Sequence, residues 1–275
     1  MALLAVGIPV LLVWIARRAV YRENLRLLRC PGRPNTVDPL HIVLLLLVWV
    51  VSSLAIGQLL AQTVSWPGPP WPAGDSDTDM RTALLTTAAS QACWMTATLL
   101  VAARTFPLGL SRGLGLSLRH WVFDGLRAVL ACLAVWPVCI GLSALCTWLL
   151  TPYNLVQQHQ MLTGMRRAGP GWGASIVLSA VVLAPLAEEL FFRGMLQSML
   201  RRVIGRPWPA VVITSAAFAA VHFSTLQDIP ALFVLSLVLG YNYERTGRLT
   251  AAVAIHALFN GIAITLMALS LSSGN

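Results

Sequence analysis

Three charged residues interrupt an apolar stretch, residues 175–202, at positions where a membrane-spanning helix normally carries none. Glu188, Glu189 and Arg193 follow thirteen almost wholly apolar residues. A helix that crosses the hydrocarbon core has about 20 apolar residues, so these charges fall near mid-depth. Placing one acidic residue there costs about 2.5 to 3.5 kcal/mol, and ionisable residues at this depth usually have a function. The stretch is therefore the first candidate for a functional site.

Helix geometry separates the roles of the two glutamates. Successive residues are rotated by about 100°, so residues four apart share a face and neighbours do not. Glu189 and Arg193 are four apart, and we predict an internal ion pair between them. Glu188 is then free to point into a cavity. The alternative is a purely structural salt bridge beside a protonated Glu188 with no role.

Four further residues have spacings that allow them to join Glu188. Phe218 and His222 are four apart on one expected helix, and His256 and Asn260 are four apart on another. Each pair lies on one helix face and can present two groups to a common centre. A single histidine in a helix more often packs, and a single asparagine more often bonds a neighbouring helix. Their combination on hydrophobic helices indicates a site.

These residue types suit hydrolysis of an acyl or peptide bond. A carboxylate can take a proton from water, and a neighbouring histidine can orient or share that proton. A neutral histidine N–H and an asparagine amide are donors that can hold a developing oxyanion. The protease motifs HExxH, GxSG and GxGD do not occur in the chain.

We expect no cofactor for this chemistry, but one metal arrangement stays open. Glu188, His222 and His256 are the side chains that would bind zinc, because three protein ligands plus a water form a catalytic zinc site. The five cysteines show no paired CxxC spacing, and three of them, Cys132, Cys139 and Cys146, fall on one face of one apolar stretch. We therefore expect neither a disulfide framework nor a zinc site from the cysteines.

The composition predicts an all-α, polytopic membrane helix bundle. The 275 residues are 57% hydrophobic and 11% charged, whereas soluble domains carry about 25% charged residues. One membrane-embedded domain, residues 1–275, accounts for the length. The net charge of +9 comes from arginines between apolar runs, which is typical of contact with the surface of a lipid bilayer and not of nucleic-acid binding.

Eight apolar runs predict about eight transmembrane helices. The sixth and seventh are only about 15 residues each, about 22 Å of helix against a hydrocarbon core of about 30 Å. They need not cross fully, in which case the segment 223–230 would lie buried within the protein. The eight runs are residues 2–16, 40–62, 82–103, 126–150, 175–200, 209–223, 229–243 and 251–271.

The loops between these runs alternate in arginine content. Residues 17–33, 104–125, 201–206 and 244–248 are richer in arginine than the loops between them, and residues 63–79 are rich in Pro, Gly and Asp. The latter composition predicts an exposed loop. Because arginine-rich loops stay on the cytoplasmic side, both termini are expected to be non-cytoplasmic. The exclusive use of arginine hints at a bacterial source, and hence at the bacterial inner membrane.

The spaced motifs resemble a known family. Glu188-Glu189-x-x-x-Arg193, then Phe218-x-x-x-His222, then His256-x-x-x-Asn260 look like the CPBP family, the CAAX proteases and bacteriocin-processing enzymes, also named the type II CAAX prenyl endopeptidase or Abi family. The segment 240–249 also resembles the stretch before the family's third motif. The resemblance covers roughly the last hundred residues, and it separates a catalytic core, residues 171–275, from N-terminal helices of unassigned role, residues 1–170.

The resemblance implies an eight-helix intramembrane glutamic endopeptidase. In that family the residues matching Glu188 and His222 activate water, and those matching His256 and Asn260 form the oxyanion site. The residues matching Glu189 and Arg193 support the first helix. The implied partner is a membrane-associated polypeptide substrate. Eukaryotic members cut prenylated C-termini, a substrate class that bacteria generally lack.

Three other readings compete with this protease. The fold could serve as a non-catalytic immunity or regulatory protein, although the complete Glu, His, His and Asn set favours an enzyme. The protease could depend on zinc. A proton-coupled transporter using Glu188 as a relay is disfavoured, because no internal repeat stands out in the chain.

Overall fold

The computed structural model describes residues 6–13, 27, 30, 32–63, 76–156, 174–175 and 177–272, and no strand occurs among them. Residues 6–13 are helical, and the longer helices after them confirm the all-α prediction. The helices are α2 (Pro39–Thr63), α3 (Ser76–Thr105), α4 (Trp121–Leu150), α7 (Ala184–Glu189), α8 (Ser198–Ile204), α9 (Pro207–Ala220), α10 (Ile229–Thr246) and α11 (Leu249–Ser272).

The stretch that carries the two glutamates forms one continuous helix, residues 177–204. Two wider, π-helical segments, η5 (Ser179–Leu183) and η6 (Leu190–Gln197), flank α7 and join it to α8. Wide turns of this kind are rare within helices and are frequent at functional sites. The hydrophobic pattern of the sequence does not distinguish them from ordinary α-helical turns.

Four helices are long and apolar enough to cross a membrane by length and composition, which confirms a polytopic membrane protein. They are Pro39–Leu60, Leu84–Thr105, Leu118–Tyr153 and Leu249–Ser270. Many of their large apolar side chains point outward, including Leu54 and Trp148, which are 64% and 71% exposed. Such outward apolar surfaces suit lipid contact. The prediction of a short sixth helix is confirmed, because α9 has only 14 residues, whereas the seventh, α10, has 18 residues and is longer than predicted.

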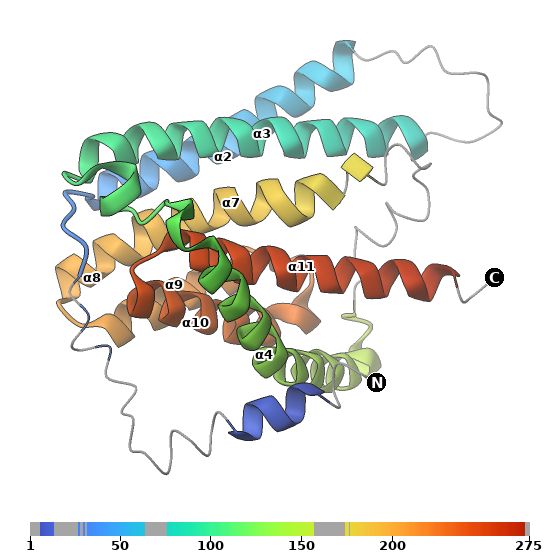
Figure 1. Cartoon of the computed structure of the whole chain (residues 1–275). Coiled ribbons are helices and arrows are strands. Elements are labelled where there is room, and N and C mark those ends of the chain that lie inside the picture. Colours follow the sequence, from blue (N-terminus) through green and yellow to red (C-terminus); the bar gives the residue numbers. More distant parts are fainter. Residues whose placement is uncertain are drawn as a thin grey trace.

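The helices pack around the stretch that carries the glutamates (Figure 1). Helices α2 and α3 lie side by side, and α3 contacts α7 and η6 on one side of the site. Helix α11 contacts α7 on the other side, and α4 crosses α11 and α10. Helices α9 and α10 form a second pair that closes the bundle. The site therefore lies between helices that are far apart in the sequence.

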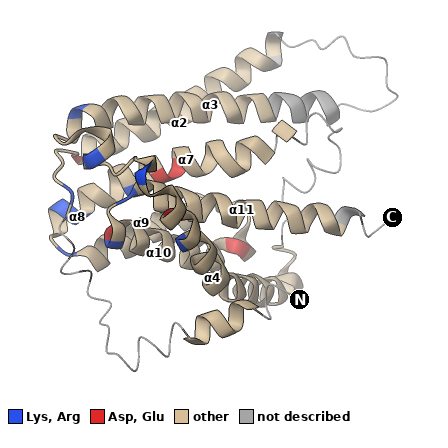
Figure 2. Ribbon diagram, viewed as in Figure 1, with Lys and Arg blue, Asp and Glu red and all other residues tan. Residues whose placement is uncertain are grey.

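The described arginines gather at one end of the bundle, near α8 (Figure 2). This arrangement brings the predicted arginine-rich loops 104–125, 201–206 and 244–248 together, as alternating spans require. Most of the fourth such loop, 17–33, and most of the poorer loop 151–173 lie outside the described residues.

The prediction of a loop over residues 63–79 is wrong for residue 63 and for residues 76–79. Helix α3 begins at Ser76, so the last four residues of that range are helical, and Thr63 ends α2. Residues 64–75 lie outside the described part of the chain. Asp77 and Asp79, which indicated a loop by composition, lie within the helical part of this range.

The start of α11 is fixed by contacts with α4 and with the segment before it. Asp124, which is 2% exposed in the first turn of α4, accepts hydrogen bonds from Nη2 and Nε of Arg248 at 2.6 and 2.8 Å. It also accepts one from Oγ1 of Thr250 at 2.8 Å. The backbone N–H of Leu249 donates to the carbonyl of Gly115 at 2.9 Å. These contacts hold the end of α11 that leads to His256.

Candidate active site

Glu189 and Arg193 form the predicted ion pair. Nη1 of Arg193 lies 2.9 Å from Oε1 of Glu189, and both side chains have no exposed surface. The pair is confirmed as a local contact because both residues project from the same continuous helix, four positions apart. An unpaired charge in this interior would be strongly unfavourable, so each partner makes the other tolerable.

The guanidinium of Arg193 is also held by a second helix and by an aromatic ring. Its Nη2 donates to Oγ of Ser236 at 2.7 Å and to the carbonyl of Ser236 at 3.3 Å. Its central carbon lies 4.8 Å from the centre of the Phe218 ring, within the range of a cation–π contact. The charge thus links α10, through Ser236, and α9, through Phe218, to the glutamate helix.

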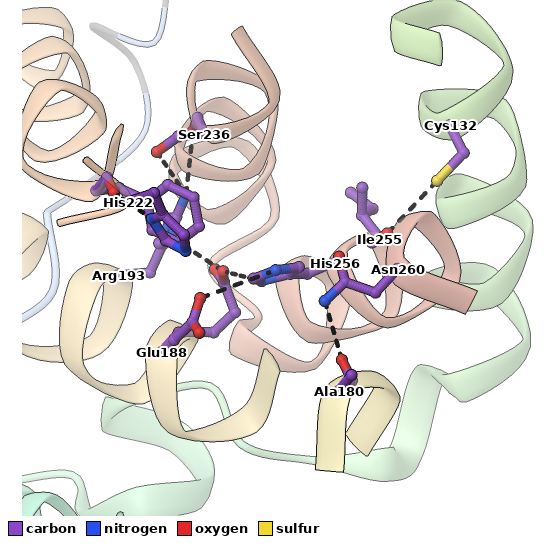
Figure 3. A network of polar contacts seen from close by, with 11 residues as sticks. Cys132, Ala180, Glu188, Arg193, His222, Ser236, Ile255, His256 and Asn260 are labelled. Carbon is purple, nitrogen blue, oxygen red and sulfur yellow. Dashed lines mark hydrogen bonds and ion pairs between the residues drawn. The ribbon is translucent and has the colours of Figure 1, made fainter. Parts of the chain in front are cut away.

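His256 faces both glutamates. Its Nδ1 lies 2.9 Å from Oε1 of Glu189, and its Nε2 lies 3.9 Å from Oε2 of Glu188 (Figure 3). The Glu189 carboxylate is paired with Arg193 and accepts hydrogen bonds, so Nδ1 of His256 donates to it. In a neutral imidazole the lone pair then lies on Nε2, on the side of Glu188. The Glu188 side chain is 19% exposed, whereas that of Glu189 has no exposed surface.

His222 is oriented by the backbone of the helix that precedes it. Its Nδ1 lies 2.8 Å from the carbonyl oxygen of Phe218, and a carbonyl can only accept, so Nδ1 carries the hydrogen. The lone pair of neutral His222 is therefore on Nε2. His222 sits just beyond the end of α9 at Ala220.

The ring of Phe218 packs against the rings of both His222 and His256. Its centre lies 4.9 Å from the ring of His222 and 5.7 Å from the ring of His256. Within the described part of the chain, no hydrogen bond or ion pair joins His222 directly to Glu188.

Asn260 lies one turn beyond His256 and contacts a different part of the glutamate helix. Its Nδ2 donates to the carbonyl of Ala180 in η5 at 2.9 Å (Figure 3). An amide nitrogen carries two hydrogens, so one donor remains after this bond. This contact ties α11 to η5.

Zinc does not fit the site as it stands. Among the residues that the structure describes, no three His, Cys, Asp or Glu side chains are grouped so as to hold a metal ion. This applies to Glu188, His222 and His256, although each of them presents a suitable donor atom.

Two of the cysteines form hydrogen bonds between helices. Cys132 and Cys139 in α4 lie 3.4 Å from the carbonyls of Ile255 and Ala231.

Two contacts of this group have no signal in the sequence. Ser236 is 43 residues from Arg193, and the carbonyl of Ala180 is 80 residues from Asn260. No spacing rule within a helix connects such positions. Only the packing of α10 and α11 against the glutamate helix brings them together.

Comparison with known proteins finds a family match over the residues that carry the candidate site. Residues 170–262 match the model of the family described as type II CAAX prenyl endopeptidase Rce1-like. An uncharacterized 24.3 kDa protein of Escherichia coli is 34% identical over 83 residues, which cover 29% of this chain and 38% of that relative. No solved structure matches. All seven motif residues lie in the matched range, so the part of this helical membrane protein that carries the candidate site, residues 170–262, is similar to the type II CAAX prenyl endopeptidase Rce1-like family.

Proposed function

We propose that this protein is an intramembrane endopeptidase that hydrolyses a peptide bond in a membrane-associated polypeptide with a water molecule activated by Glu188. The observation that carries the proposal is the placement of the accessible Glu188 carboxylate opposite Nε2 of His256, beside a fully buried Glu189–Arg193 pair. The match to a protease family supports the same conclusion.

The first step is attack by water. Glu188 and Nε2 of His222 are the two acceptors that can orient a water molecule between α7 and the turn after α9. Glu188 takes one proton of that water as the oxygen attacks the carbonyl carbon of the peptide bond. The carbonyl π electrons move to oxygen, which gives a tetrahedral intermediate with one negative charge.

The second step is stabilisation of that oxyanion and loss of the amine. The structure adds a condition to the role of His256: with Nδ1–H bound to Glu189, Nε2 donates only when the imidazole is protonated. Glu188 is already protonated at this stage, so two anions, Glu189 and the oxyanion, and two cations, Arg193 and His256, form a group of zero net charge. His256 and the remaining N–H of Asn260 then hold the oxyanion. As the C–N bond breaks, Glu188 returns its proton to the leaving amine.

A cleavage assay tests the proposal. The purified protein in detergent is incubated with a fluorogenic peptide, and Glu188→Gln and His222→Ala are each expected to abolish cleavage with the protein still folded. The matched control for the histidine change is His120→Ala, because His120 is exposed at the start of α4. Cleavage that survives both changes would refute the mechanism.

The same assay separates the other functions. A non-catalytic immunity or regulatory protein would show no cleavage in any form, and would bind its partner equally well after Glu188→Gln. A transporter would move protons across a vesicle membrane in a Glu188-dependent manner without cutting a peptide.

Substrate and orientation are further parts of the proposal. A comparison of membrane-fraction peptides from cells with the native chain and with Glu188→Gln would identify a polypeptide substrate. It would also show whether that substrate carries a prenyl group. We place the protein in a bacterial inner membrane with both termini outside the cytoplasm, which reporter fusions to each terminus would test.

A further inference from the structure

Ser236 is a fully buried polar residue that the motifs do not include. It lies in α10 and has no exposed surface. Both its side-chain and its backbone oxygens accept hydrogen bonds from the same atom, Nη2 of Arg193, at 2.7 and 3.3 Å. Within the described residues, Glu189 and Ser236 are the side chains that hydrogen-bond the guanidinium, whose Nε has no partner.

These two partners determine how the guanidinium is oriented. A hydrogen bond to Glu189 through Nη1 alone would leave the planar group free to rotate about that contact. The bond from Nη2 to Ser236 fixes a second nitrogen, and the Phe218 ring lies against the guanidinium at 4.8 Å. Together they leave the guanidinium a single orientation.

The orientation of Arg193 is passed on to His256 through one atom. Oε1 of Glu189 accepts both from Nη1 of Arg193 and from Nδ1 of His256, each at 2.9 Å. The other oxygen of Glu189, Oε2, is buried without a hydrogen-bond partner. The position of Oε1 therefore depends on Arg193, and the direction in which Nε2 of His256 points depends on Oε1.

We propose that Ser236 is a positioning residue for His256, acting through Arg193 and Glu189. This inference rests on the proposed function, in which His256 stabilises the oxyanion. Without the Ser236 hydroxyl, Arg193 keeps its charge and its pair but loses its second side-chain anchor. The imidazole of His256 then samples orientations that do not aim Nε2 at the reacting carbonyl.

Ser215 provides a matched control. It is also a buried serine, 1% exposed, on the neighbouring helix α9. Its hydroxyl has no hydrogen-bond partner, so Ser215→Ala removes the same atom from the same kind of environment without touching the network. A merely structural role for buried hydroxyls would give similar effects at both positions.

The experiment combines kinetics with a signal from the histidine itself. We expect Ser236→Ala to lower kcat about tenfold with KM changed less than about twofold, since an interaction acting in the transition state alters kcat. It should also shift the ¹⁵N resonances of His256, assigned with His256→Gln. Ser236→Thr, which keeps the hydroxyl that accepts from Arg193, should restore both. Ser215→Ala should change neither quantity.

Two results would overturn the inference. One is a Ser236→Ala protein with native kcat and native His256 resonances, and the other is an equal loss in Ser215→Ala. The Glu188→Gln protein separates this failure from that of the proposed function. If it still cleaves, the glutamate mechanism is wrong, whereas the resonances of His256 still report whether Ser236 positions the ring.

Discussion

Oε1 of Glu189 lies 2.9 Å from Nδ1 of His256 and 2.9 Å from Nη1 of Arg193. One buried carboxylate oxygen therefore connects the charge that makes the glutamate helix tolerable to the imidazole that faces Glu188. In the proposed mechanism the two adjacent glutamates therefore have different roles. Glu189 orients the site from inside the protein, and Glu188 acts on the water molecule.

Removal of the Glu189 charge should destabilise the protein far more than removal of the Glu188 charge. Glu189→Gln leaves Arg193 as an uncompensated buried cation, a change that costs about 3 to 5 kcal/mol. Glu188→Gln is expected to cost less than about 1 kcal/mol, because Glu188 is partly exposed and its ion pair is long. Both proteins are unfolded in detergent while circular dichroism is recorded, and the two curves give the difference in the free energy of unfolding. Equal losses would contradict the assignment of the two roles.

Replacement of Phe218 should remove the ring against which Arg193, His222 and His256 pack. Phe218→Ala creates a cavity at a site with no exposed surface, which costs about 3 to 5 kcal/mol. Phe218→Leu keeps most of the volume but loses the cation–π contact, worth about 0.5 to 2 kcal/mol, and should lower kcat. Phe223→Leu is the matched control, because Phe223 is 71% exposed. A Phe218→Leu protein as stable and active as this control would contradict the role of the ring.

A test of how α11 is held can be made at two glycines. Gly115 and Gly109 have similar positive φ values, +79° and +71°, so alanine costs about 1 kcal/mol at either position through the backbone alone. At Gly115 the added Cβ would also overlap the carbonyl oxygen of Gly247, whereas at Gly109 it meets nothing within 4 Å. We expect Gly115→Ala to be clearly less stable than Gly109→Ala and to lose activity. Similar thermal midpoints of the two variants would show that the backbone around Gly115 and Gly247 can shift at little cost, which would contradict this account of how α11 is held.

Chelation should leave cleavage unchanged. The proposed chemistry uses Glu188 as the base and His256 and Asn260 as donors, and it requires no metal at any step. Activity is measured after exhaustive dialysis against a chelator, with metal content determined on the same sample. Loss of activity that added zinc restores would favour the zinc-dependent protease, with Glu188, His222 and His256 drawn together as ligands.

Local contacts of the site are predictable from the sequence. The Glu189–Arg193 pair follows from a four-residue spacing on one helix, since such neighbours meet in almost any helical context. The same spacing places Phe218 beside His222, and their contact is present. The shortness of α9 follows from the length of its apolar run. These features depend on residues close together in the chain, so the pattern of residue types is sufficient.

The sequence by itself determined the all-α membrane class, because a composition so apolar can be buried only in lipid or between helices, and it determined which residues share a helix face. The tertiary structure decided that Glu189 also forms a hydrogen bond with His256, which is 67 residues away. It also decided that Ser236 accepts a hydrogen bond from Arg193 and that Asn260 donates one to the carbonyl of Ala180. Those contacts depend on how helices cross and rotate against one another. Crossing and rotation are set by the packing of many side chains at once, which no spacing within a single helix encodes.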